Sequence, residues 1–377
     1  MKTVKDIPNL KDKKVLLRVD FDMALNQQLT INNQPSSSVS HGARIAEPFR
    51  VEKQKLMIDY LIEHDAKVVM VAHLGDTGEF APLIPQLHML LGREIAFLKS
   101  IEEIPAYLEN YAGPALLENI RRFPGEKEND EELAQKLSSG LDIYINNAFA
   151  VCHRKHASVS AVTKFLPSYA GFLVEEEIAK LGQAIDAPAE EKVIIMGGVK
   201  AETKAPVIKN LIDNADKILL SGVIANDIAK ARGEDIGRSV VDDNINKILS
   251  NLDIASPKLV LPVDYIMAEN RRLDIGEKTI AMYREVINSA KTIIWNGPMG
   301  VFEKDEFSAG TKLVAQAVAD SSAIKIIGGG DTIAAVNRFS IPLEKFTFVS
   351  TGGGAMLAFL AGERLSGLEA LGYYADK

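Results

Sequence analysis

The stretch Trp295-Asn296-Gly297-Pro298-Met299-Gly300-Val301-Phe302-Glu303 is the most informative part of this sequence. An apolar, strand-like run, Thr292–Trp295, ends here in glycine and proline, and a single acid follows. Two later apolar runs also stop in glycine, at Ile326–Asp331 and at Phe348–Gly354. Glycine lets a ligand approach the main chain, and free N–H groups at a helix start attract anions. These three strand ends therefore predict a nucleotide-binding surface.

The composition is that of an ordinary globular protein. The 377 residues are 47% apolar and 25% charged, and their number favours two domains. The single Cys152 excludes an internal disulfide, no apolar run reaches the length of a membrane span, and the N-terminus lacks an apolar signal core. We therefore expect a cytoplasmic protein with no membrane segment. The net charge of −8 argues against general nucleic-acid binding, so an anionic substrate would need a local cluster of Lys and Arg.

Apolar runs alternate with amphipathic, helix-like stretches along the whole chain. This alternation predicts an α/β protein with open parallel sheets covered by helices. A long pattern at Val174–Ile185 separates two such series, and its charged face, Glu175-Glu176-Glu177 with Lys180, predicts a helix that spans between two domains. The predicted strands are Val15–Val19, Lys67–Ala72, Ile143–Ile145, Val193–Met196, Ile218–Leu220, Leu259–Leu261, Ile293–Trp295, Ile324–Ile327 and Phe346–Val349.

Polar residues follow many of these strands directly. In open α/β sheets, ligands bind outside the carboxyl ends of the strands. The first half offers Arg and His, which suit a small anion, and the second half offers glycine, lysine and an acid, which suit a nucleotide and a metal ion. That division predicts phosphoryl transfer. The residues at these ends are Arg18, Asp20, His73, Asn146, Asn147, His153, Arg154 and His156, and then Gly197–Lys200, Gly222, Asp264, Asn296 and Asp331.

Each feature alone also has a simpler interpretation. Gly328–Gly330 is consistent with a plain turn, and Asp331 with a cap for the following helix. Arg50 could begin a solvated helix, and Lys200 with Lys204 could be an exposed pair. His153 and His156 could bind a metal, although further ligands are lacking. Neither a G-x-x-x-x-G-K-[ST] motif nor a protein-kinase catalytic loop is present, which argues against the ordinary kinase classes.

Taken together, these segments resemble the phosphoglycerate kinase family, in unbroken order through nearly the full length. The family has two Rossmann-like domains joined by a helix and a hinge, and its C-terminal tail returns to the first domain. The resemblance implies an acceptor domain at 1–172, a nucleotide-binding domain at 173–363, and a returning tail from about 364 to 377. The residues that carry it are Arg18–Phe21, Ala72–Gly75, Leu117–Asn119 with Arg121, His153–Ser158, Gly197–Lys200 with Lys204, Trp295–Glu303, Gly328–Thr332 and Ser350–Ala355.

The resemblance also implies an activity and a set of partners. The family exchanges a phosphoryl group between ATP and the carboxylate of 3-phosphoglycerate, uses Mg²⁺, and closes a hinge as a monomer. The acceptor would contact Asp20, Asp22, Arg50, His73, Arg121 and Arg154, with Arg122 as the neighbouring alternative to Arg121. The nucleotide would contact Lys200, Lys204, Asn296, Glu303, Gly330, Asp331, Thr332 and Gly352–Gly354, with Asp331 on the magnesium ion.

Three of these residues would act on the transferring group itself. Arg50 would stabilise it, Lys200 would hold the nucleotide phosphates, and the amide of Gly353 would support the migrating charge at a helix N-terminus.

Several positions depart from the family pattern. Asp22 stands where the family usually has Asn, and Asp76 stands where it usually has Arg, so carboxylates enter the predicted acceptor pocket. Repulsion between these carboxylates and an anionic substrate would weaken binding. Other departures are Asn147, Ala150, the triplet Ser221-Gly222-Val223, and the long segment Asn26–Phe49.

Three hypotheses follow from this pattern. The first is a working phosphoglycerate kinase with weakened acceptor binding. The second is a related phosphotransferase that acts on a different, less anionic carboxylate. The third is a nucleotide-binding protein without turnover.

Overall fold

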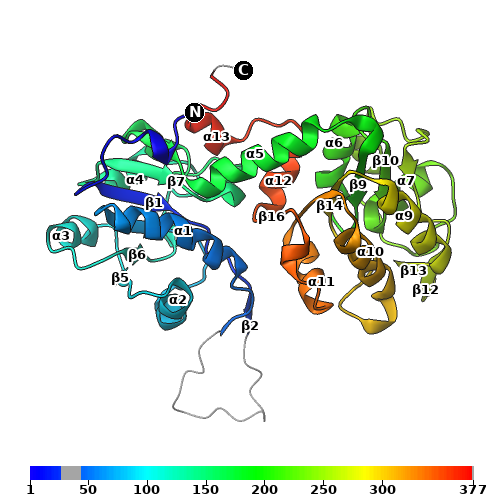
Figure 1. The fold of residues 1–377 in the computed structure, drawn as a ribbon, viewed down its shortest axis with the longest axis horizontal. Helices are drawn as coiled ribbons and strands as arrows, with labels where there is room; N and C mark the ends of the chain where they lie inside the picture. The colour runs from blue at the N-terminus through cyan, green and yellow to red at the C-terminus, as the bar shows by residue number, and fades with distance from the viewer. Residues whose placement is uncertain (27–43, 376–377) are drawn as a thin grey trace, which may run out of the picture. The chain divides into compact units, whose positions relative to one another are not determined.

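The computed structural model describes residues 1–26 and 44–375, which form two compact units (Figure 1). Unit 1 comprises Met1–Glu176 and the chain from Leu365 onward, and unit 2 comprises Glu177–Arg364. Sequence analysis placed the boundary after residue 172 and the returning tail from about residue 364. The assignment of one unit to the acceptor and the other to the nucleotide stays a prediction. Most of the predicted long loop, residues 27–43, lies outside the described residues.

Within the described residues, unit 1 contains a parallel sheet of six strands in the order β5-β6-β4-β1-β7-β8. The chain first adds strands on one side of β1 and then, from β7, on the other side. The carboxyl ends of β1 and β7 therefore form a topological switch point, where open α/β sheets bind ligands. The strands are β1 (Lys14–Arg18), β4 (Lys67–Val71), β5 (Ala96–Leu98), β6 (Ala115–Leu117), β7 (Ile143–Asn146) and β8 (Ser168–Ala170).

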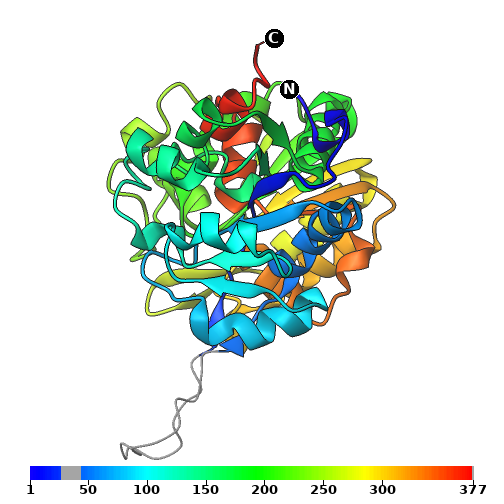
Figure 2. The same ribbon diagram turned by 90° about the vertical axis from the view of Figure 1, so that its left-hand side faces the viewer.

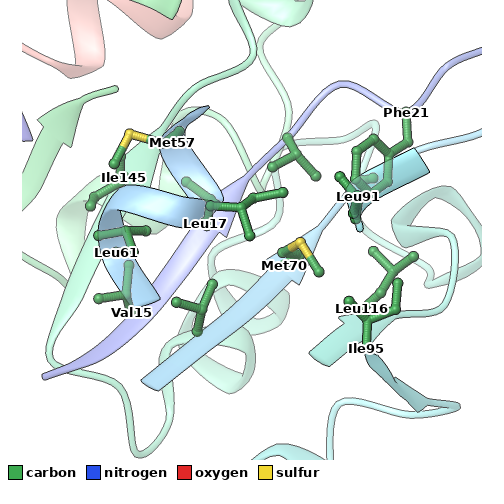
Figure 3. Close-up of a cluster of buried hydrophobic side chains, with 14 of the residues drawn as sticks. Val15, Leu17, Phe21, Met57, Leu61, Met70, Leu91, Ile95, Leu116 and Ile145 are labelled. Atoms are coloured by element: carbon green, nitrogen blue, oxygen red, sulfur yellow. The ribbon is translucent and has the colours of Figure 1, made fainter. Parts of the chain in front are cut away.

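Both faces of this sheet are buried, and Figure 2 shows its strands and the helices of unit 1 from a second direction. Leu17 of β1 lies in a core cluster with Met57 and Leu61 of α1, as Figure 3 shows. Its neighbour Leu16 belongs to a second cluster with Leu137 of α4. Burial on both faces explains why the strand sequences are continuously apolar. The other elements of unit 1 are α1 (Phe49–Glu63), α2 (Ile84–Leu91), α3 (Glu103–Glu109), α4 (Glu131–Ser138), α13 (Ser366–Ala370) and a hairpin of β2 (Leu25–Asn26) with β3 (Arg44–Ile45).

Unit 2 repeats this plan with a second parallel sheet, ordered β11-β10-β9-β14-β15-β16 among the described residues. Here the switch point lies between β9 and β14. Its strands are β9 (Lys192–Met196), β10 (Lys217–Leu220), β11 (Leu259–Val260), β14 (Thr292–Asn296), β15 (Ile324–Gly328) and β16 (Phe348–Ser350), with an antiparallel hairpin of β12 (Tyr265–Ala268) and β13 (Arg271–Ile275). Its helices are α6 (Ala201–Leu211), α7 (Gly222–Ala231), α8 (Ile245–Ile248), α9 (Glu277–Ser289), α10 (Ala309–Asp320), α11 (Gly330–Arg338) and α12 (Gly353–Leu360).

The predicted α/β class with parallel sheets is confirmed, and the nine predicted strands correspond to strands of the two sheets. The predicted spanning helix is α5 (Phe172–Asp186), which carries the chain across the boundary between the units. Sequence analysis did not predict β5, β6 and β8, which have only three residues each. Runs this short give little periodicity, and neighbouring strands decide whether they pair.

A buried carboxylate in unit 2 leads to a prediction about stability. Asp227 of α7 is fully buried; its Oδ1 accepts the Asp242 N–H at 3.0 Å, and its Oδ2 has no hydrogen-bond partner within residues 1–26 and 44–375. Burial raises the pKa of Asp227 to about 6. Since this acid has a folded-state pKa above its unfolded value, its charge destabilises the fold above about pH 6 and has no effect below about pH 4.

Asp227→Asn should therefore raise the free energy of unfolding by about 2 kcal/mol at about pH 7.5, with no gain at about pH 4. Urea denaturation at both pH values measures this difference. The control is Asp213→Asn, which alters an exposed carboxylate of the same unit and should change stability by less than about 0.5 kcal/mol. An equal gain at both pH values would contradict the electrostatic explanation.

Candidate functional site

A buried arginine ties the strand ends of unit 1 together. Arg18, the last residue of β1, is 1% exposed. Its Nη1 donates to the carbonyl oxygens of Val19 at 2.5 Å and of Val71 at 3.3 Å, and its Nε donates to Ser158 Oγ at 3.1 Å. Ser158 Oγ donates in turn to Glu126 Oε1 at 2.7 Å. Because a buried charge is costly unless it is paired and hydrogen-bonded, this network fixes the ends of β1 and β4 against the loop around Ser158.

His73, just after β4, is 2% exposed and contacts two guanidinium groups. Its Nδ1 lies 3.3 Å from Arg18 Nη2, and its Nε2 lies 3.2 Å from Arg154 Nη1 and 3.3 Å from Asp22 Oδ2. Burial lowers the pKa of His73, so the ring is neutral and accepts at only one nitrogen. Guanidinium groups only donate, so the buried Arg18 makes Nδ1 the acceptor, and Nε2–H donates to Asp22. Arg154 Nη1 then has no acceptor on the ring and is available to an anion.

Asp20 and Asp22 both contact Arg50, which stands in the first turn of α1. Arg50 Nη1 lies 3.4 Å from Asp20 Oδ2 and 3.9 Å from Asp22 Oδ2, and it donates to the Asp22 carbonyl oxygen at 3.0 Å. Asp22 Oδ1 also accepts the Gly75 N–H at 2.9 Å. Burial acts to raise the pKa of Asp22, but the hydrogen bonds from His73 and Gly75 and the charge of Arg50 hold it well below its usual range. Asp22 is therefore ionised, paired with Arg50 and hydrogen-bonded to His73 and Gly75.

Asp76, the second departure from the family pattern, pairs with two cations. Arg121 Nη1 lies 3.1 Å from Asp76 Oδ1, and Lys127 Nζ lies 2.9 Å from the same oxygen. Arg121 also donates to the Gly75 carbonyl oxygen at 3.1 Å. Burial and, to a smaller extent, the charges of His156 and Arg121 lower the pKa of His153, the residue before Arg154. No motif or spacing in the sequence pointed to Lys127.

We call Arg50, His73, Arg121 and Arg154 the basic cluster. These are the predicted acceptor residues other than the two acids, and the contacts above link them, directly or through neighbours, at the carboxyl ends of β1 and β4. The alternative residue Arg122 pairs instead with Glu79 at 2.7 Å and with Glu118 at 3.6 Å. The basic cluster therefore includes Arg121 and not its neighbour.

In unit 2, the main chain is closely packed at the switch point between β9 and β14. The Gly197 N–H donates to the Asn296 carbonyl oxygen at 3.0 Å. Gly297 has a φ of +91°, and a Cβ on it would lie 2.2 Å from the Gly197 carbonyl oxygen. A larger residue is therefore excluded at position 297 by both conformation and space. This close approach explains why glycine occupies position 297 in the stretch Trp295–Glu303.

The turns before α11 and α12 lie next to each other. A Cβ on Gly353 would lie 3.3 Å from Gly329 Cα. Asn296 Nδ2 donates to the Gly328 carbonyl oxygen at 2.8 Å, and the Gly297 N–H donates to Thr332 Oγ1 at 2.7 Å. Asn296 and Thr332 are both buried, and these two hydrogen bonds hold the turn before α11 against the end of β14.

A cavity of about 500 Å³ opens beside these turns. Its wall includes Glu303 and Asp331 from the predicted nucleotide set, together with Gly198 and Gly222. It also includes Asp274, whose Oδ2 accepts the Gly310 N–H at 2.7 Å and which sequence analysis missed. The remaining lining residues are Val199, Val223, Asn226, Val240, Pro262, Tyr265, Arg271, Arg272, Leu273, Ile275, Pro298, Met299, Gly300, Val301 and Phe302.

Lys200 and Lys204 lie at the start of α6, where Lys200 is the exposed N-cap residue and Lys204 is buried. Lys204 Nζ donates to the Lys200 carbonyl oxygen at 3.2 Å. Burial lowers the pKa of Lys204 to about 8, and the charge of Asp331 partly opposes that shift. Lys204 is therefore not a surface lysine, and its charge interacts with that of Asp331. Asp331 is exposed in the first turn of α11, whose N-cap is Gly329, so it does not serve as the cap.

A buried glutamate holds the turn before α12. Glu177 of α5 is fully buried, and its carboxylate accepts from Ser350 Oγ at 2.7 Å, from the Thr351 N–H at 2.7 Å and from Thr351 Oγ1 at 2.9 Å. Sequence analysis placed Glu177 on the charged face of the spanning helix. That was wrong, because residues 173 positions away supply three donors and allow its burial.

The described residues contain neither a group of metal-binding side chains nor a helix that could span a membrane. In residues 1–26 and 44–375, no three His, Cys, Asp or Glu side chains gather as a metal-binding group, so His153 and His156 lack further ligands there. Across the same ranges, no helix has both the length and the apolar character needed to cross a bilayer.

The sequence of this chain is similar to those of known proteins. Residues 4–363 match the sequence model of a family described as "Phosphoglycerate kinase". The chain belongs to the phosphoglycerate kinase family. The phosphoglycerate kinase of Herpetosiphon aurantiacus is 37% identical over 403 residues, covering 98% of each chain. That of Prochlorococcus marinus is 38% identical over 405 residues and covers 97% of each chain.

Solved phosphoglycerate kinase structures agree with this assignment. The Coxiella burnetii enzyme matches with a TM-score of 0.79 and 30% identity, covering 99% of each chain. The Pyrococcus horikoshii enzyme matches with a TM-score of 0.84 and 31% identity, covering 99% of this chain and 98% of the other. The resemblance identified from sequence motifs is thus confirmed, while the roles of individual residues stay predictions.

The three hydrogen bonds to Glu177 lead to a second prediction. Glu177→Ala should lower the free energy of unfolding of unit 2 by about 3 kcal/mol, because it leaves the donors of Ser350 and Thr351 buried without acceptors. Glu177→Gln keeps one carbonyl acceptor and should have a smaller effect. Hydrogen exchange at the Thr351 and Gly352 amides should quicken in step with the loss of stability.

The matched control is Glu176→Ala, which removes the adjacent, exposed carboxylate of the same helix and should change neither measurement. Equal effects of the two alanine substitutions would show that general helix properties, and not the turn before α12, respond to the change.

Proposed function

We propose that this chain transfers a phosphoryl group between ATP and the carboxylate of 3-phosphoglycerate, giving ADP and 1,3-bisphosphoglycerate, as a glycolytic kinase of the cytoplasm. The proposal includes hinge-bending about α5 and a monomeric state. The acceptor would bind at the basic cluster of unit 1, and the nucleotide would bind in the cavity of unit 2. Neither nucleic acid nor membrane takes part.

One observation carries this proposal: a member of this family retains both a basic cluster at one switch point and a glycine-lined cavity at the other. In unit 1, Arg154 Nη1 lacks an acceptor on His73, and Arg121 Nε is buried without a hydrogen-bond partner among the described residues. Donors left in this state favour an anionic ligand. In unit 2, Asp331 lines the cavity, and its charge interacts with that of the buried Lys204; a carboxylate and a lysine suit a magnesium-bound phosphate chain.

The chemistry requires alignment and charge neutralisation more than proton transfer. A carboxylate acceptor is already ionised at neutral pH, so no general base is needed. Catalysis then depends on positioning the two substrates and stabilising charge on the moving group. Arg50 would stabilise that group, and Asp20 and Asp22 hold its guanidinium at the end of β1. The amides of Gly352, Gly353 and Gly354 at the start of α12 would receive the migrating negative charge.

The proposed nucleotide contacts all come from residues of unit 2. Lys200 and Lys204 would bind phosphate oxygens, and Asn296, Gly330 and Thr332 would lie beside the same phosphates. Glu303, which lines the cavity, would accept the ribose hydroxyls. Asp331 fits a magnesium ion, because Mg²⁺ is held in such sites by one or two carboxylates together with substrate phosphates. Bound there, the ion would neutralise phosphate charge.

A second candidate is a phosphotransferase for a less anionic carboxylate. The two acids in the acceptor region, Asp22 and Asp76, favour it, because they neutralise Arg50 and Arg121, two cations that an anionic substrate would otherwise meet. A nucleotide-binding protein without turnover is the third possibility, and a measurement of activity separates it from the other two.

A coupled assay with ATP, magnesium and 3-phosphoglycerate tests the proposal. We expect turnover, and Arg50→Met should lower kcat by at least about a hundredfold while leaving the Kd for ADP unchanged. The control Arg93→Met removes an arginine that pairs with Asp59, outside the basic cluster, and should keep full activity. Absence of turnover in a parent protein that still binds ADP would contradict the proposed reaction.

The lowered pKa of Lys204 predicts how nucleotide affinity depends on pH. A bound phosphate favours protonated Lys204 and so raises its pKa from about 8. Affinity is therefore complete below this value and is lost as the pH rises through it. The Kd for ADP should increase about tenfold between about pH 7 and about pH 9.

Lys204→Met, which has a side chain of similar length and no charge, should bind ADP more weakly than the parent and show no such increase. Isothermal titration calorimetry across this pH range measures both proteins. A parallel pH dependence in the variant would assign the effect to another group.

A further inference from the structure

Asp76 makes an arrangement that the proposed function does not explain. A single carboxylate oxygen, Oδ1, lies 3.1 Å from Arg121 Nη1 and 2.9 Å from Lys127 Nζ. These two cations come from different turns, one in the short 3-10 helix Ile120–Arg122 and the other after it. Two cations that converge on one oxygen also suit an oxygen of a phosphate group.

The side chains of Arg121 and Asp76 differ in how far they are exposed to solvent. The Arg121 side chain is 9% exposed and held by the Gly75 carbonyl oxygen, so it has a fixed position. The Asp76 side chain is 63% exposed and follows Gly75, whose φ is +50°. Among the described residues, the hydrogen bonds and ion pairs of the Asp76 carboxylate go only to Arg121 and Lys127. The carboxylate can therefore rotate into water without breaking other contacts, and rotation would release both cations.

We propose that Asp76 is a built-in competitor for the phosphate group of the acceptor, and that Lys127 is an additional phosphate-binding residue of this chain. This inference rests on the proposed function, which places the acceptor at the basic cluster. A phosphate binds Arg121 and Lys127 by displacing the Asp76 carboxylate, and it stays close to that displaced charge. Both effects weaken the binding of acceptors that carry a phosphate and leave acceptors without one unaffected.

The consequence is a change in substrate selection. The cations around the phosphate still exceed the anions, so a phosphorylated acceptor binds, but with a smaller advantage over a carboxylate that lacks the phosphate. Asp76 thus acts as a specificity-determining residue. It differs from Asp22, whose carboxylate is bound to His73 and the Gly75 N–H and so cannot leave as freely.

Calorimetric titration of the full chain with 3-phosphoglycerate and with glycerate tests this inference. Glycerate has the same carboxylate and hydroxyl group but no phosphate. Asp76→Asn should bind 3-phosphoglycerate about tenfold more tightly than the parent and bind glycerate with unchanged affinity. Lys127→Met, in the Asp76→Asn background, should reverse most of this gain. The control Glu79→Gln alters a neighbouring exposed acid that pairs with Arg122, and should change neither affinity.

The outcomes separate this inference from the proposed function. Unchanged or weaker binding of 3-phosphoglycerate by Asp76→Asn, in a parent that turns this substrate over, overturns the competitor role and leaves the function intact. In that case Asp76 serves to position Arg121 and Lys127. If the parent shows no turnover, titration with inorganic phosphate gives the answer, because tighter binding by Asp76→Asn supports the competitor role even though the proposed reaction fails.

Discussion

The burial of the Arg18 guanidinium is the constraint on which the arrangement of unit 1 depends. A charge with 1% exposure must be satisfied by the protein itself, and its acceptors come from β1, from the end of β4 and from Ser158. Its remaining donor sets the tautomer of His73, which in turn binds Asp22 and leaves Arg154 Nη1 without an acceptor on the ring. The open positions of the basic cluster thus follow from the need to satisfy one buried cation.

In unit 2, the buried charge that the protein must satisfy with its own hydrogen bonds is an anion. The carboxylate of Glu177 is buried and accepts three hydrogen bonds from the turn before α12, whose following amides are the ones expected to receive negative charge. The glutamate fixes this turn through Ser350 and Thr351, and Ser350 Oγ in turn accepts the Gly352 N–H at 3.1 Å. Close packing of Gly353 against Gly329 then places two helix starts side by side.

Asp22 and Asp76, the two acids that depart from the family pattern, have different roles in the structure, although the sequence predicted the same role for both. Both were expected to repel an anionic acceptor. Asp22 is instead a structural partner of His73, Gly75 and Arg50, so its charge is largely compensated. Asp76 is exposed, and its partners are the cations best suited to a phosphate. Burial and hydrogen bonding, which a sequence does not reveal, distinguish the two.

Local patterns were sufficient to predict the α/β class, the strands long enough to show a continuous apolar run, and the family, because glycine turns and strand ends have short, specific sequences. Packing between distant segments was needed to establish that Arg121 and not Arg122 joins the basic cluster, that Lys127 pairs with Asp76, and that Glu177 is buried. Each of these depends on partners far away in the chain, as with Glu177 and Ser350. The free energy of a charged side chain is set by the groups packed around it, and a linear pattern does not contain that information.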